Sequence, residues 1–96
     1  MKAIVSVIGK DKRGIIAHVS AALYKMDVNI EDISQTILQE YFTMIMAVDL
    51  DASPLDFDAV KTRLAELGAS LGVEINIQLQ SIFDSMHRVD TGAHSL

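Results

Sequence analysis

Hydrophobic and polar residues alternate along the first half of the chain in patterns that predict two strands and a helix. Residues 2–9 are rich in β-branched side chains and predict a strand buried on both faces. Residues 14–26 repeat apolar positions at helical spacing. Residues 28–38 predict a second strand, whose alternation slips between Ile30 and Ile33. That slip is typical of a bulge or of an edge strand.

The second half repeats the order of strand, helix and strand. Residues 41–50 carry apolar side chains on both faces, which predicts another central strand. Ser53 as a cap, followed by Pro54, predicts the start of a second helix, and Gly72 predicts its end. Residues 73–80 alternate strictly between apolar and polar, as in a strand with one buried face.

Six elements in this order predict an α+β fold of the ferredoxin-like type, βαββαβ. Right-handed crossovers favour a four-stranded antiparallel sheet of order 4-1-3-2, with two helices on one face. The domain is expected to span residues 1–80. Residues 81–89 predict a short C-terminal helix that packs on the sheet or on a dimer partner, and residues 90–96 predict a mobile tail.

Composition narrows the class of protein. The chain has 96 residues, a net charge of -5 and no cysteine, which favours a single globular domain without disulfides or thiolate metal sites. Lys10, Lys12 and Arg13 form its largest basic cluster, so neither nucleic acid nor an anionic membrane is an expected partner. Met1 leads directly into a strand pattern and no apolar run reaches membrane-spanning length. We expect a cytoplasmic domain that needs no cofactor.

One loop has the features of a binding site. Residues 8–17, "IGKDKRGIIA", leave a buried strand, pass through alternating charges and enter a helix at Gly14. The loop is either a plain connection or a holder for a small polar molecule. Gly14 lets backbone approach a ligand closely, and the free N–H groups of a helix start stabilise a carboxylate. Asp11 suits an α-ammonium group, and Asn29 suits further hydrogen bonds.

The sequence from this loop onward resembles the ACT domain family, and the whole chain resembles its short, free-standing bacterial members. The resemblance rests on Asp11-Lys12-Arg13-Gly14-Ile15-Ile16, on Asn29-Ile30 and on Phe42-Thr43-Met44. It implies a regulatory module that is often dimeric and often binds amino acids, and it implies no catalysis. The ligand-binding residues expected from the motif and from the charge of the loop are Asp11, Arg13, Gly14, Ile15, Asn29 and Ile30.

The chain departs from the family pattern at two positions. Arg13 stands where proline is usual, and Gly9 stands where some amino-acid-binding relatives carry a polar side chain.

The length of the first helix leads to an expectation about the assembly. A helix of 12–14 residues is roughly 20 Å long, so Asp11 and Asn29 should lie at opposite ends of one chain. They meet in one site only across a two-fold axis, which predicts a homodimer with two sites built by strand 2 or helix 1.

Other readings of the sequence remain open. The chain could be a protein–protein interaction module, a regulatory subunit without a small ligand that acts on an unknown protein. No nucleophile with a histidine and acid partner is recognisable, and no histidine pair has metal-ligand spacing, so neither an enzyme nor a metal site is expected. The apolar stripe of residues 82–89 is expected to cross the uncovered sheet face and to help build the dimer.

Overall fold

The computed structural model describes residues 1–10 and 14–85. Its elements are β1 (Lys2–Lys10), α1 (Ile15–Lys25), β2 (Asn29–Leu38), β3 (Tyr41–Asp49), α2 (Phe57–Leu71) and β4 (Glu74–Leu79). They form one antiparallel sheet of order β2-β3-β1-β4. This is the predicted order 4-1-3-2 read from the other edge, and the ferredoxin-like fold is confirmed.

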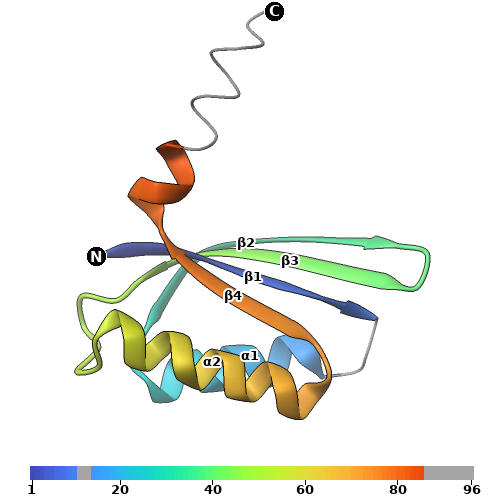
Figure 1. Ribbon diagram of the computed structural model, residues 1–96, viewed down its shortest axis with the longest axis horizontal. Coiled ribbons are helices and arrows are strands. Elements are labelled where there is room, and N and C mark those ends of the chain that lie inside the picture. Colours follow the sequence, from blue (N-terminus) through green and yellow to red (C-terminus); the bar gives the residue numbers. More distant parts are fainter. Residues whose placement is uncertain (11–13, 86–96) are drawn as a thin grey trace, which may run out of the picture.

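The two helices cover one face of the sheet, and a short helical turn over residues 80–85 rises from β4 on the opposite face (Figure 1). The core lies between the helices and the sheet because β1 and β3 alternate buried and less buried residues along their length. The buried apolar residues of this core are Ala3, Val5, Val7, Ile15, Val19, Leu23, Met26, Val28, Phe42, Met44, Met46, Val48, Leu50, Val60, Leu64, Val73, Ile75 and Ile77.

Several local predictions are confirmed. The pairing of β2 with β3 shifts register between Ile30 and Asp32, which is the predicted irregularity. Gly72 ends α2 in the left-handed conformation, at φ 73°, and β2 and β4 are the edge strands. No helix in the described ranges is long and apolar enough to span a membrane.

The predicted start of the second helix is wrong by several residues. Asp56, and not Ser53, is the N-cap of α2, and its carboxylate accepts a hydrogen bond of 2.8 Å from the Ala59 N–H. Ser53 instead accepts a bond of 3.2 Å from the Leu55 N–H, which belongs to the turn before the helix. A serine side chain accepts a hydrogen bond from a nearby backbone N–H in a turn just as it does at the start of a helix. The sequence pattern alone therefore does not distinguish the two cases, and this explains the error.

Candidate ligand-binding groove at the start of α1

The first turn of α1 begins at a glycine. Gly14 occupies the N-cap position in the left-handed conformation (φ 81°, ψ 1°) and has no side chain with which to cap the helix. Its carbonyl oxygen accepts the bond of 2.9 Å from the His18 N–H that opens the helix. The N–H groups of a first helical turn have no intrahelical acceptor, so the turn that starts at Ile15 presents donors to an incoming acceptor.

A groove of about 450 Å³ lies beside this helix start. One wall is the first turn of α1, and the other is the far end of the β2–β3 hairpin, where Ile37 pairs with Phe42. Gln35 is the polar side chain among its strand residues. The lining residues are Gly14, Ile15, Ile16, Ala17, Gln35, Ile37 and Phe42. An apolar wall beside the N–H groups of a helix start suits a molecule with one anionic end and one apolar end.

The predicted site residues divide into three groups. Gly14 and Ile15 line the groove. Asp11 and Arg13 lie outside the described residues. Asn29 and Ile30 begin β2 at the other end of the molecule, and Asn29 lines a separate hollow of about 300 Å³ beside Tyr24.

The strand register shows how far apart these ends are. Asn29 pairs with Asp49 at the end of β3, whereas Lys10, the last residue of β1, pairs with Tyr41 at its start. A strand of nine residues is roughly 30 Å long. Asn29 therefore cannot reach the groove of its own chain, as its sequence position relative to the helix predicts.

Packing explains the glycine that departs from the family pattern. A Cβ atom on Gly9 would lie 2.6 Å from Cγ1 and 3.0 Å from Cβ of Val73. Val73 is itself part of the core. A polar side chain at position 9 would require Val73 to move and would therefore destabilise the core.

No pattern in the sequence identified the residues on the strand side of the groove. Gln35 and Ile37 reach it because the hairpin extends past α1, and both are exposed in one chain. An alternating pattern assigns the side chains of a strand to one face of the sheet, but it does not say which helix residues they lie beside. Among the described residues, no group of three histidine, cysteine or acidic side chains is arranged to hold a metal ion.

The fold is that of a small ferredoxin-like α+β domain, and comparison with known proteins identifies the family. The ACT domain model matches residues 2–78. The chain belongs to the ACT domain family, whose members are regulatory modules that bind small ligands such as amino acids.

Individual relatives agree with this family. The chain is 64% identical over 89 residues to a UPF0237 protein of Clostridium acetobutylicum, an alignment that covers 93% of this chain and all of that one. It is 47% identical over the same length to a UPF0237 protein of Listeria innocua. A solved ACT domain protein from Streptococcus pneumoniae superposes with a TM-score of 0.77 at 47% identity, covering 86% of this chain and 93% of that one.

Proposed function

We propose that this protein is a non-catalytic cytoplasmic sensor that binds an amino acid with an apolar side chain, in a groove completed by a second copy. The observation that carries this proposal is the first turn of α1, which begins at Gly14 and faces an apolar strand wall. No general base or nucleophile is needed for such a role, and none of the groove residues supplies one.

The groove matches the three parts of an amino acid. The carboxylate accepts hydrogen bonds from the first-turn N–H groups beside Gly14, where the helix dipole is positive. The apolar side chain lies against Ile37 and Phe42. We assign Asp11 to the α-ammonium group, and the positive charge of Arg13 to further attraction for the anionic end.

The second copy supplies the missing polar group. β2 is an edge strand, and its side chains are largely exposed. Two β2 strands paired antiparallel about a two-fold axis place the start of one beside the end of the other. Asn29 and Ile30 of one copy then lie next to Ile37 of its mate, at the mouth of the mate's groove.

A thermal denaturation panel tests ligand binding. L-leucine, L-isoleucine, L-valine and L-phenylalanine should raise Tm, whereas L-glutamate and L-lysine should not. A ligand at ten times its Kd stabilises the native state by roughly 1.4 kcal/mol, which corresponds to roughly 6–11 °C for a domain of this size. Unchanged Tm with every amino acid at millimolar concentration would refute the sensor.

Two glycine variants locate the ligand. Gly14 and Gly72 both have positive φ, 81° and 73°, so alanine at either position should cost about 1 kcal/mol of stability through backbone strain. Only Gly14→Ala changes the groove, and it should weaken the amino acid at least about ten-fold, a difference of about 1.4 kcal/mol. Equal ligand shifts in Gly14→Ala and Gly72→Ala would place the site elsewhere.

A second candidate function has its own observation. Ile33, Ile37, Leu38 and Tyr41 are 42%, 58%, 70% and 52% exposed along the β2–β3 hairpin. Exposed apolar residues that gather on one element favour a protein interaction surface. A regulatory subunit without a ligand would show no Tm shift with amino acids and would retain a stoichiometric protein partner. Gly14→Ala would not change the binding of that partner.

A further inference from the structure

The outer edge of β4 is open to another strand. β4 is the last strand of the sheet and pairs with β1 on its inner side. Alternate backbone N–H and C=O groups of an edge strand point away from the sheet and can pair with a further strand. Within the described residues, no other strand lies beside this edge. The outer main-chain groups of β4 can therefore accept an added strand.

β4 lacks the features that usually oppose strand pairing at an edge. Those features include bulges, prolines and lysines within the strand. The register of β4 on β1 is continuous from Leu79 to Glu74, and the strand, EINIQL, contains neither proline nor lysine. By contrast, the pairing of β2 at the opposite edge shifts register between Ile30 and Asp32. β4 is the more regular of the two edges, and a regular edge is the better template for strand addition.

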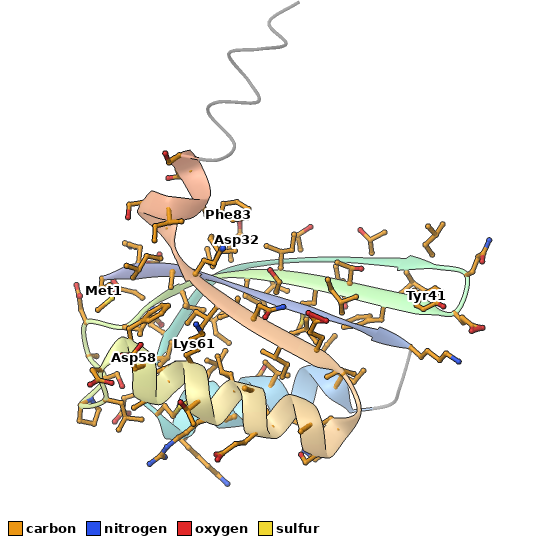
Figure 2. The ribbon with its side chains drawn as sticks, in the orientation of Figure 1. Met1, Asp32, Tyr41, Asp58, Lys61 and Phe83 are labelled. Carbon is orange, nitrogen blue, oxygen red and sulfur yellow. The ribbon has the colours of Figure 1, made fainter. Side chains whose placement is uncertain are left out.

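A hollow of about 330 Å³ lies at this edge. Its lining includes Asn76, Ile77 and Gln78 of β4, Lys61 of α2 and Phe83 of the turn that follows β4. Figure 2 shows Lys61 on the helix side of the sheet and Phe83 on the opposite side. Because β4 and β1 are paired continuously, a hollow that reaches both side chains passes around the outer edge of β4. An added strand would occupy that space.

The charges at this edge favour an acidic group on the helix side of the sheet. Lys61 is exposed, and it forms no salt bridge with any residue in the described ranges. Glu74 is the charged residue of β4, and its carboxylate accepts a hydrogen bond of 3.1 Å from the Asn76 amide. Both side chains alternate with the buried Ile75 and therefore lie on the face away from the helices. A carboxylate is attracted to Lys61 on one face and repelled by Glu74 on the other.

We propose that the outer edge of β4 binds an extended segment of another protein, which adds a strand to the sheet and carries an acidic residue beside Lys61. Main-chain hydrogen bonds to the edge supply affinity, and the side chains of the added strand supply specificity. Neighbouring residues of a strand point to opposite faces. An acidic residue next to an apolar one therefore places its carboxylate beside Lys61 and the apolar side chain beside Phe83.

This surface is separate from the proposed amino acid site. β4 and β2 form opposite edges of the sheet, and the hollow at β4 shares no lining residue with the groove at the start of α1. A strand added to β4 therefore leaves the edge of β2 open to a second copy. The two proposals can fail independently.

Short random peptides displayed on phage provide the probes. Selection on the purified wild-type protein should enrich peptides in which an acidic residue stands next to an apolar one. Labelled synthetic copies of these peptides should bind Lys61→Glu at least about ten-fold more weakly than the wild type in fluorescence polarisation. N-methylation of alternate peptide residues should abolish binding for one of the two alternating sets and not for the other, because only one set donates N–H groups to β4.

Two variants serve as controls for Lys61. Arg63→Glu makes the same charge reversal on the same helix, but Arg63 lines a different hollow, beside Lys25 of α1. At physiological salt it should change peptide affinity by less than about two-fold, since distant surface charges are screened. Lysines near an edge can also oppose strand addition. A lysine with only that role would make Lys61→Ala bind the peptides more tightly, and such a gain would overturn the proposal.

The remaining outcomes also decide the matter. A selection that enriches no peptide overturns the proposal, as does equal binding to the wild type and Lys61→Glu. Binding that survives N-methylation of both sets would reduce the site to a charge contact without an added strand. A change in the mean mass of the protein on Lys61→Glu substitution, measured without peptide by sedimentation equilibrium, would assign this edge to a second copy instead.

Discussion

Replacing Gly68 with alanine should lower Tm by roughly 8–16 °C, although alanine is the better helix former. Gly68 lies in α2 where the helix crosses the start of β4. A Cβ atom there would lie 2.7 Å from the backbone oxygen of Val73 and 3.2 Å from Cγ1 of Ile75. Overpacking against backbone costs about 3 kcal/mol, and the gain in helix propensity is about 1 kcal/mol. The net loss of about 2 kcal/mol corresponds to the stated shift for a domain of this size.

The neighbouring residue provides the control for Gly68. Ala69 is exposed on the same helix, so Ala69→Gly should cost only the helix propensity of about 1 kcal/mol. Chemical denaturation followed by circular dichroism measures both variants. An increase in stability of about 1 kcal/mol for Gly68→Ala would show that α2 does not approach β4 this closely.

Replacing Gly9 with alanine should cost about 2–3 kcal/mol of stability for a different reason. The new Cβ would lie 2.6 Å from Cγ1 of Val73, a short branched side chain with little freedom to move away. This contact is also the reason the chain has no polar side chain at a position where some amino-acid-binding relatives have one. A polar substitution at Gly9 should therefore destabilise the fold before it alters ligand recognition.

A double-mutant cycle isolates the contact between Gly9 and Val73. Val73→Ala removes the atom that lies 2.6 Å away and leaves the Cβ atom at 3.0 Å and the Cα atom at 3.4 Å. Gly9→Ala should then cost less than about 1 kcal/mol in the Val73→Ala background, a coupling of at least about 1 kcal/mol. Additive costs would mean that strain at Gly9 comes from the backbone and not from Val73.

Most of the fold could be predicted from periodicity because its signals are local. The alternation over residues 73–80 and the slip near Ile30 both correspond to features of the structure. The start of α2 could not be predicted to the residue, because Ser53 and Asp56 offer the same capping chemistry and only the path of the chain selects one.

The groove could be predicted in part. Gly14 and Ile15 are sequence neighbours of the loop motif, so the motif itself locates them. Gln35 and Ile37 reach the same groove only through the register of β2 on β3, and periodicity fixes a face without fixing register. The orientation of β1 shows the same limit. Residues 2–9 predict a strand that is buried on both faces, which does not say which face meets the helices, and the structure places Val5 and Val7 on the helix side.

The central claim is that each ligand site combines Gly14 of one copy with Asn29 of another. Gly14→Ala and Asn29→Ala should each abolish binding of the amino acid that gives the largest Tm shift. Mixing the two variant proteins and allowing their subunits to exchange should restore binding, measured by equilibrium dialysis, at about one quarter of the sites. Half of the random dimers are mixed, and each mixed dimer has one intact site out of two. A mixture that binds no more ligand than its separate components would contradict the shared site.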